Sequence, residues 1–271
     1  MISGPSKGGG TAPLSTTPLC NLSGLLSTSI AALIILAIAS AQLGRGAEQA
    51  VLVAAAADLA GVQGALERGF KKATDKDIRF SLGASGMLAR QIEQGAPYDI
   101  FLSANETFVA DLAREGRLEP GSVRVYAYGR LGLWSKSGRV KALADLKSPR
   151  ILHVAIANPV HAPYGAAART MFERLGMWKQ IEPKVVYGEN VRQALQYAES
   201  GNADAAVTAW SLVYDRGGVL LPDATYPPIR QAGGVVAGRP QAAVARRFLE
   251  FLGSAEGRRI LTAAGFDVSR R

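Results

Sequence analysis

Cysteine is nearly absent from this chain, and histidine is scarce. The single cysteine, Cys20, precedes an apolar run at residues 30–39, which is the wrong side of that run for a lipoprotein acceptor. A mature chain that begins after this run has no cysteine, so disulfides and thiol chemistry are excluded. The two histidines, His153 and His161, are the only candidates for an imidazole base. We place His153 inside a strand, in a structural role, and His161 in a loop.

Motifs for metals and nucleic acids are missing as well. The sequence has no HExxH pair, no cysteine cluster and no EF-hand pattern, so we predict no metal centre and no cofactor. The formal net charge is +9 at pH 7, yet the bases are spread along the chain with few aromatic residues among them. This spread argues against nucleic-acid binding. A positive field favours the approach of an anion, and it also serves solubility.

Acidic residues are absent from residues 1–41, which contain one base, Lys7. The ten-residue apolar run would span about 15 Å as a helix, roughly half of a bilayer core. It ends in Ala39-Ser40-Ala41, the small-x-small pattern of a signal-peptidase site. We therefore predict that residues 1–41 are a signal peptide and that the mature, periplasmic protein begins near Gln42. An uncleaved anchor is the alternative, and the long polar stretch before the run suggests a start codon downstream of Met1.

Short apolar segments alternate with amphipathic ones from residue 51 onward. We expect strands at 51–56, 78–82, 99–103, 123–127, 131–134, 153–157, 184–187, 205–208, 218–221 and 233–236. Helices are expected between them, with apolar faces around 59–70, 88–92, 105–113, 164–175, 190–198 and 244–261. This order of strands and helices predicts the α/β class, with mainly parallel sheets.

One junction between a strand and a helix carries the most information. Gly83-Ala84-Ser85-Gly86 separates the strand at 78–82 from a helix that bears Leu88 and Ile92 on one face. Small residues let a ligand approach the backbone, and the first N–H groups of the helix have no partner within it. With the Ser85 hydroxyl as a further donor, this turn suits an anion. A serine nucleophile is not indicated, because the final glycine of a G-x-S-x-G elbow is missing.

Three other turns share this chemistry: Ala57-Asp58, Pro163-Tyr164-Gly165 and Asn190-Val191. Each follows a strand and begins a helix, which is where ligands collect in open α/β sheets. None of the four contains lysine or arginine. Any one of them alone is typical of an ordinary capped turn, and their spacing does not show that they converge. Together they indicate an oxyanion held by neutral donors.

Several runs resemble the molybdate-binding proteins of bacterial ABC importers. The resemblance rests on the runs at 55–59, 83–86 with 88–92, 95–101 with 103–104, 158–159 with 162–165, and 189–192 with 194–195. It covers nearly all of the chain from Val51. It implies a two-lobed periplasmic binding protein, α/β, each lobe a mainly parallel sheet flanked by helices with the ligand in the cleft. Lobe I would comprise residues 48–125 plus 230–271 and lobe II residues 126–229, with crossings near Tyr126 and Ile229.

Four oxyanion-binding residues follow from the resemblance. Ser85 would give its hydroxyl and backbone N–H, whereas Tyr164 and Val191 would give backbone N–H groups. Asp58 stands where the family has a serine or asparagine, and its carboxylate would repel a dianion. We prefer the interpretation that this carboxylate caps its helix while only the N–H faces the ligand. In the alternative, the ligand carries a proton that Asp58 accepts, which would point to a phosphate-like substrate. A tyrosine used by one family branch corresponds here to Thr208, which we do not carry over.

The resemblance implies a non-enzymatic monomer that delivers molybdate, or tungstate, to the membrane permease of an ABC importer. Another oxyanion carrier, for sulfate or phosphate, is the nearest alternative. The ligand-sensing domain of a transcription regulator shares the fold, but a hydrophobic leader stands here in place of a helix-turn-helix.

Overall fold

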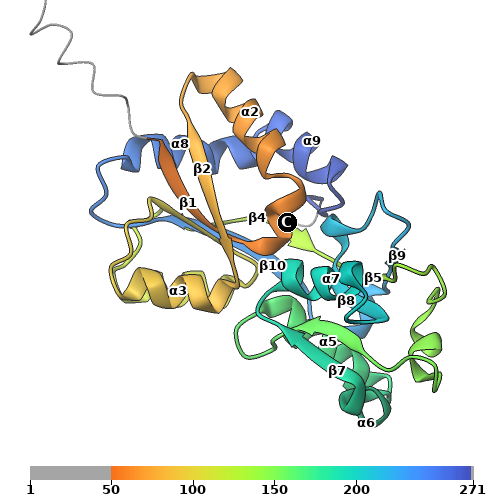
Figure 1. Ribbon diagram of the computed structural model, residues 1–271. Coiled ribbons are helices and arrows are strands. Elements are labelled where there is room, and N and C mark those ends of the chain that lie inside the picture. The colour runs from red at the N-terminus through yellow and green to blue at the C-terminus, as the bar shows by residue number, and fades with distance from the viewer. Residues whose placement is uncertain (1–49, 270–271) are drawn as a thin grey trace, which may run out of the picture. The chain divides into compact units, whose positions relative to one another are not determined.

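The structure is a computed structural model that describes residues 50–269 (Figure 1). The predicted signal peptide at 1–41 and the start near Gln42 lie outside the described residues. Within the described part, no helix is long and apolar enough to cross a membrane.

The first sheet has the strand order β2-β1-β3-β10-β4. Its strands are β1 (Val51–Ala56), β2 (Ile78–Gly83), β3 (Ile100–Ser103), β4 (Arg124–Gly129) and β10 (Ile229–Val235). β1 runs parallel to β2 and β3, whereas β10 is antiparallel to both of its neighbours. Its helices are η1 (Ala57–Gly61), α2 (Gln63–Thr74), α3 (Ser85–Glu93), α4 (Glu106–Arg114), α8 (Ala242–Gly253) and α9 (Ala255–Ala263). We call this half the first lobe.

The second sheet, which defines the second lobe, has the order β7-β6-β8-β5-β9. Its strands are β5 (Leu131–Trp134), β6 (Val154–Ala157), β7 (Val185–Gly188), β8 (Ala205–Ala209) and β9 (Val219–Leu220). β6 is parallel to β7 and β8, and β5 is antiparallel to β8 and β9. The helices are η2 (Leu143–Lys147), α5 (Pro163–Arg174), α6 (Trp178–Ile181), η3 (Glu182–Lys184), α7 (Val191–Ser200), η4 (Trp210–Leu212) and η5 (Asp223–Thr225). The expected two-lobed α/β architecture is confirmed.

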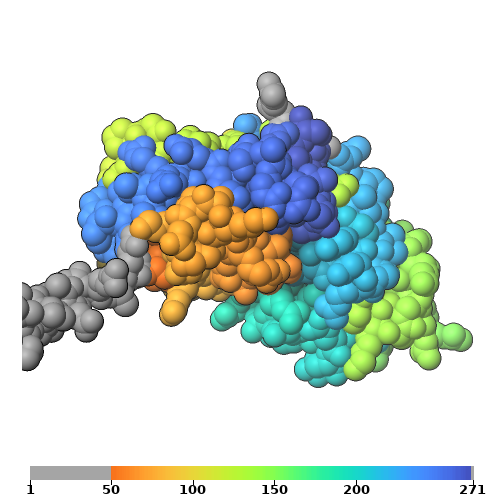
Figure 2. All heavy atoms as spheres, turned by 90° about the horizontal axis from the view of Figure 1, so that it is seen from above, coloured from red at the N-terminus to blue at the C-terminus, as the bar shows by residue number. Residues whose placement is uncertain are grey.

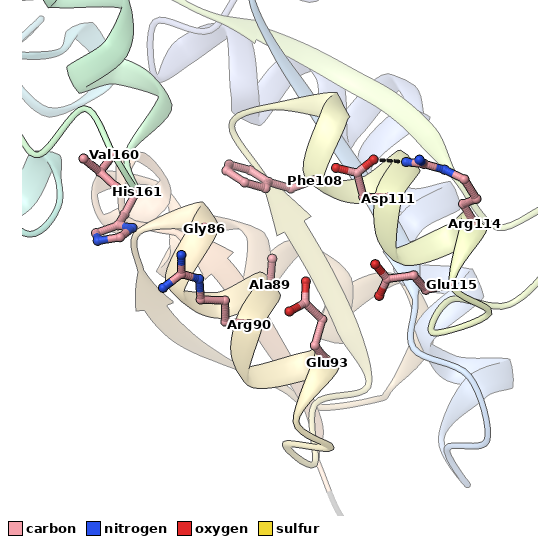
Figure 3. A pocket seen from close by; sticks show the side chains of 10 residues that line it. All are labelled: Gly86, Ala89, Arg90, Glu93, Phe108, Asp111, Arg114, Glu115, Val160 and His161. Carbon is pink, nitrogen blue, oxygen red and sulfur yellow. Dashed lines mark hydrogen bonds and ion pairs between the residues drawn. The ribbon is translucent and has the colours of Figure 1, made fainter.

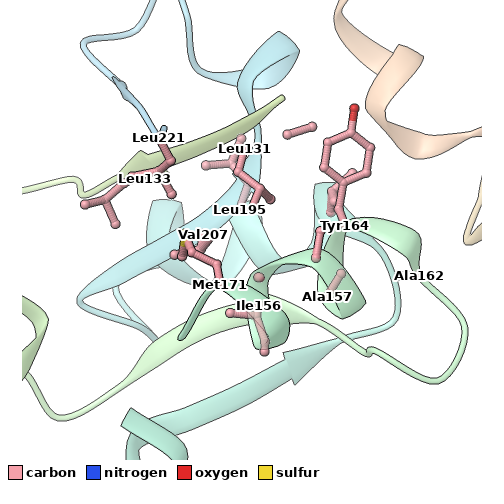
Figure 4. Close-up of a cluster of buried hydrophobic side chains, with 14 of the residues drawn as sticks. Leu131, Leu133, Ile156, Ala157, Ala162, Tyr164, Met171, Leu195, Val207 and Leu221 are labelled. Atoms are coloured by element: carbon pink, nitrogen blue, oxygen red, sulfur yellow. The ribbon is translucent and has the colours of Figure 1, made fainter. Parts of the chain in front are cut away.

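Each lobe is held by its own apolar core. In the first lobe, Phe70 of α2 packs edge-on against Phe248 and Phe251 of α8, with ring centroids 5.2 and 5.7 Å away. Figure 2 shows α2 in orange beside the blue C-terminal helices, so the two ends of the described chain share this core. In the second lobe, Leu131 and Met171 belong to another cluster (Figure 4), which extends to four buried alanines of the first lobe, Ala56, Ala57, Ala84 and Ala104.

Four local expectations were wrong or incomplete. The helix expected over 59–70 is divided into η1 and α2 at Val62. His153 lies just before β6 and is exposed, because pairing with β8 begins at Val154. Leu175, expected to be buried, is the residue after α5 and is 42% exposed. β10 starts at Ile229, four residues earlier than predicted, since its pairing with β4 extends to that end.

The two sheets are joined where β4 gives way to β5. β4 ends at Gly129 and β5 begins at Leu131, with only Arg130 between them. The Arg130 guanidinium donates to the Gly265 carbonyl, at 2.8 Å from Nη2. Tyr128 and Asp267 exchange backbone hydrogen bonds of 2.7 and 3.0 Å. The C-terminal segment therefore braces the crossing between the lobes.

Candidate oxyanion site

The four turns chosen from the sequence lie together. They follow β1, β2, β6 and β7, and in each lobe the two strands are parallel and run in one sheet, so their carboxyl ends lie on one side. The turns line one small hollow, in which the volume open to the centres of water-sized spheres is about 10 Å³. Its lining residues are Ala56, Ala57, Asp58, Gly83, Ala84, Ser85, Ala104, Ala162, Pro163, Tyr164, Asn190 and Val191. Both lobes contribute lining residues, and among the lining residues named here Asp58 alone is charged.

Backbone donors are available at this hollow. Within residues 50–269, the amide N–H groups of Ser85, Tyr164 and Val191 have no protein acceptor. Each belongs to the first turn of a helix of nine or more residues, where such groups are free of intrahelical bonds. At α7, Asn190 caps the N–H groups of Arg192 and Gln193 through Oδ1. This cap leaves the Val191 N–H as the donor available for a ligand.

Ser85 is oriented by the neighbouring loop. Its side chain is 1% exposed, and Oγ accepts the Ala104 N–H at 3.0 Å. This bond uses a lone pair of the hydroxyl oxygen. The hydroxyl proton stays available, because it has no acceptor in the described chain. Ser85 can therefore offer both an O–H and an N–H to an anion.

Asp58 lies at the centre of a buried polar network. Its Oδ2 accepts hydrogen bonds from the Tyr164 hydroxyl at 2.7 Å and from Gln231 Nε2 at 2.6 Å. Gln231 Nε2 also donates to the Tyr164 hydroxyl at 3.2 Å, and Gln231 Oε1 accepts from Tyr126 at 3.1 Å. The other carboxyl oxygen of Asp58, Oδ1, is buried and has no hydrogen-bond partner in the described residues. One carboxyl group thus connects η1, α5 and β10.

The preferred expectation for Asp58 was wrong in one respect. Its carboxylate does not cap the helix, because Ala56 is the N-cap residue of η1 and no side chain caps it. Asp58 lies inside that first turn, and its carboxyl turns to the Tyr164 and Gln231 donors instead. The alternative, a proton held between Asp58 and the ligand, stays a prediction.

Burial controls the ionisation of this group. Removal from water raises the pKa of the Asp58 carboxyl from 3.8 to about 7, while the hydrogen bonds from Tyr164 and Gln231 lower it. The amide N–H groups of Asp58 and Leu59 also lower this pKa. Burial and the nearby Asp58 charge raise the pKa of Tyr164 well above its usual value, so its phenol stays protonated and donates.

The lobes contact each other directly around the hollow. The Gly86 N–H of α3 donates to the His161 carbonyl at 3.0 Å, and the Ser211 hydroxyl of η4 donates to the Asp58 carbonyl at 2.8 Å. A Cβ on Gly86 would lie 3.1 Å from that same His161 oxygen. A larger residue at position 86 would therefore press on this contact between the lobes.

Sequence reasoning missed Gln231, Tyr126 and Ser211. Gln231 carried no clear signal in the sequence, because it precedes the strand expected at 233–236; only the structure shows it as a fully buried amide on β10. Thr208, which we did not carry over, lies behind the site: its hydroxyl donates to the Val191 carbonyl at 2.8 Å.

Tyr164 is placed by packing. Figure 4 shows its ring at the edge of the second-lobe cluster, with the hydroxyl directed away from that cluster.

A larger hollow lies beside the site, between α3, α4 and the loop that contains His161 (Figure 3). It shares Gly86 with the turn at Ser85. Its charged lining consists of two arginines, Arg90 and Arg114, and three acids, Glu93, Asp111 and Glu115. Asp111 and Arg114 pair with each other. The acids outnumber the bases, so this hollow is poorly suited to a dianion.

Comparisons with known proteins agree with this geometry. The family described as bacterial extracellular solute-binding protein matches residues 51–267. The molybdate-binding protein ModA of Rhodobacter capsulatus is 36% identical, over 73% of this chain and 80% of that protein. ModA of Azotobacter vinelandii is 34% identical, over 80% of this chain and 90% of that protein.

Solved structures lead to the same group. The periplasmic molybdate-binding protein of A. vinelandii superposes with a TM-score of 0.76 at 29% identity, covering 81% of this chain and all of that one. The sulfate-binding protein SubI of Mycobacterium tuberculosis shares the fold, with a TM-score of 0.69 at 16% identity. The two-lobed fold, the hollow between the lobes and the match over nearly the whole described chain lead to one conclusion: this chain belongs to the bacterial extracellular solute-binding proteins, which bind solutes and are not enzymes.

Proposed function

We propose that this protein captures molybdate in the hollow between its lobes and delivers it to the permease of an ABC importer. Tungstate, an oxyanion of the same shape and charge, is proposed as a second ligand. The observation that carries the proposal is the convergence of helix starts from both lobes on one hollow whose lining contains no lysine or arginine. The relatives named above as molybdate-binding proteins give the ligand its identity.

The chemistry of the donors fits a tetrahedral oxyanion. Ser85, Tyr164 and Val191 would supply N–H groups from three helix starts, and Ser85 would add its hydroxyl. Such neutral donors are fixed by the fold, and they replace the hydration shell of the anion without a counter-ion.

The remaining parts of the proposal concern location and assembly. We propose an exported, periplasmic monomer, consistent with a family of extracellular proteins. We also propose that lobe I comprises residues 48–125 plus 230–271 and lobe II residues 126–229. Two strands of the first sheet lie near these bounds: β4 pairs with β10 as far as Gly129 and Ile229, a few residues beyond the proposed bound at 126, and β5 opens the second sheet at Leu131.

Phosphate is the second candidate, and Asp58 is the observation that favours it. A buried carboxylate with a free Oδ1 could accept the proton that hydrogen phosphate carries. Molybdate is a dianion without a proton at neutral pH. Molybdate remains the first choice because the relatives that are 36% and 34% identical are molybdate-binding proteins.

Calorimetric titration of the purified protein tests the ligand. Molybdate, tungstate, sulfate and phosphate are titrated separately at one pH and one ionic strength. We expect molybdate and tungstate to bind at least about tenfold more tightly than the other two, which corresponds to about 1.4 kcal/mol. Binding of phosphate or sulfate with no heat from molybdate would overturn the choice of ligand.

A further inference from the structure

The buried carboxyl of Asp58 has no positive partner. It is 0% exposed, and none of the ion pairs in residues 50–269 includes it. The groups that face it are the phenols of Tyr164 and Tyr126, the Gln231 amide and the amide N–H groups of η1. Ser211 of η4 bonds the Asp58 carbonyl and not its carboxyl. All of these groups are neutral, so hydrogen bonds but no positive charge face a negative charge on Asp58.

The hydrogen bonds identify the oxygen that can carry a proton. Oδ2 already accepts two hydrogen bonds, one from Tyr164 and one from Gln231. The only other partner of the Tyr164 hydroxyl is the Gln231 NH₂ group, which is a donor, so the phenol proton must point to Asp58. Oδ2 therefore acts as an acceptor only. Oδ1 is the position left for an acidic proton, and it has no acceptor in the described chain.

A dianion in the hollow would place two further negative charges beside this group. Asp58 lines that hollow, whose other lining residues are uncharged. A carboxylate buried with an anion and no cation is strongly disfavoured, whereas a neutral carboxylic acid can donate a hydrogen bond to it. We propose that Asp58 binds the oxyanion as a neutral carboxylic acid, so that closing the site over molybdate takes up one proton from solution.

The proton balance is simple. A buffer acid releases a proton, Oδ1 of Asp58 receives it, and the O–H then donates to an oxygen of the anion. The raised pKa of Asp58 even without a ligand supports this, because little further increase is needed for full protonation near neutral pH. The inference rests on the proposed function, since it concerns the same hollow and the same class of ligand.

Linkage gives the direction and size of the effect. Where the complex holds one proton more than the free protein, affinity falls about tenfold for each unit of pH. We expect molybdate binding to weaken by about tenfold or more between pH 7 and pH 9, a range in which molybdate itself stays a dianion. Titrations in two buffers of different ionisation enthalpy count the protons directly, and we expect about one per molybdate at pH 8.

Asp58→Asn is the decisive variant, because it imitates the protonated acid. Its carbonyl oxygen can accept from Tyr164 and Gln231, and its NH₂ group is a permanent donor in place of the acid O–H. We expect this variant to bind molybdate as tightly at pH 9 as at pH 7, within about twofold, and to take up no proton. Ser85→Ala is the matched control: it should bind more weakly at every pH but keep the wild-type proton count.

The outcomes separate the two proposals. If the wild type binds none of the four oxyanions, the proposed function fails. If it binds molybdate with no proton uptake and no pH dependence, the function stands and the inference about Asp58 is overturned. This result needs only the wild type, so it does not depend on the folding of a variant. A pH dependence that persists unchanged in a folded Asp58→Asn protein would also overturn the inference.

Discussion

Replacement of Ser85 by alanine tests the anion site most directly. The Ser85 hydroxyl keeps its proton free for a ligand, while its oxygen holds the Ala104 N–H. Loss of a hydrogen bond to a charged ligand costs about 1.5–3 kcal/mol. That free energy corresponds to a molybdate affinity roughly 10- to 150-fold weaker.

The same change has a separate effect on stability. Ala104 is 1% exposed, so its N–H would be left without a partner, which costs about 1–3 kcal/mol. For a domain of this size, each kcal/mol lowers Tm by about 2–4 °C. We therefore expect Ser85→Ala to melt several degrees lower and still fold.

Ser103→Ala separates these two effects. Ser103 is also a fully buried serine at the start of the loop to α4, and its hydroxyl bonds the backbone N–H and carbonyl of Asn105. It does not line the hollow. We expect Ser103→Ala to lose stability without losing affinity by calorimetry. Unchanged molybdate affinity in Ser85→Ala, or an equal loss in both variants, would refute the assignment of Ser85.

Three further results are expected from the network around Asp58. Tyr164→Phe removes a hydrogen bond that lowers the pKa of Asp58, so molybdate affinity measured against pH should persist to higher pH than in the wild type. Gly129→Ala should cost about 1–3 kcal/mol in chemical denaturation, because the added Cβ would overlap the Tyr164 hydroxyl, whereas the Cβ in Gly253→Ala meets nothing within 4 Å. The folded pKa of Asp58 is raised from 3.8 to about 7, so its contribution to the unfolding free energy is complete below about pH 4 and is lost as pH rises to about 7. The stability of Asp58→Asn relative to wild type, measured by denaturation without ligand, should therefore increase over that range.

Local patterns in the sequence predicted the elements well, because each element depends on neighbours in the chain. The N-cap of α4 at Asn105, which accepts the Thr107 N–H, is such a case. So is the turn at Ser85, where small residues separate a strand from an apolar helical face. Apart from the division of the helix expected over 59–70 at Val62, the errors fell at element ends. His153 and Leu175 lie one residue beyond β6 and α5, and strand pairing and helix packing decide such boundaries.

Local sequence patterns could not predict that the four turns converge on one hollow. Asp58 and Gln231 are 173 residues apart in sequence, and they meet because β10 returns to lie between β3 and β4. The Tyr164 hydroxyl reaches them only because Gly129 has no side chain at that point. The local sequence predicted each helix start. The hydrogen bond that Gln231 donates to Asp58 depends on β10, which local sequence could not place beside the proposed anion site.

The Asp58 carboxyl takes part both in the charge of the site and in the contact between the lobes. Asp58 and its amide donor Gln231 belong to the first lobe, and its hydroxyl donor Tyr164 belongs to the second. If the lobes separated, the hydrogen bond from Tyr164 would be lost and water would reach the carboxyl, which favours its ionised form. An ionised Asp58 repels the anion, whereas the closed arrangement favours the neutral acid. Under the proposal made above, the protonation of one buried carboxyl therefore links capture of the oxyanion to the contact between the lobes.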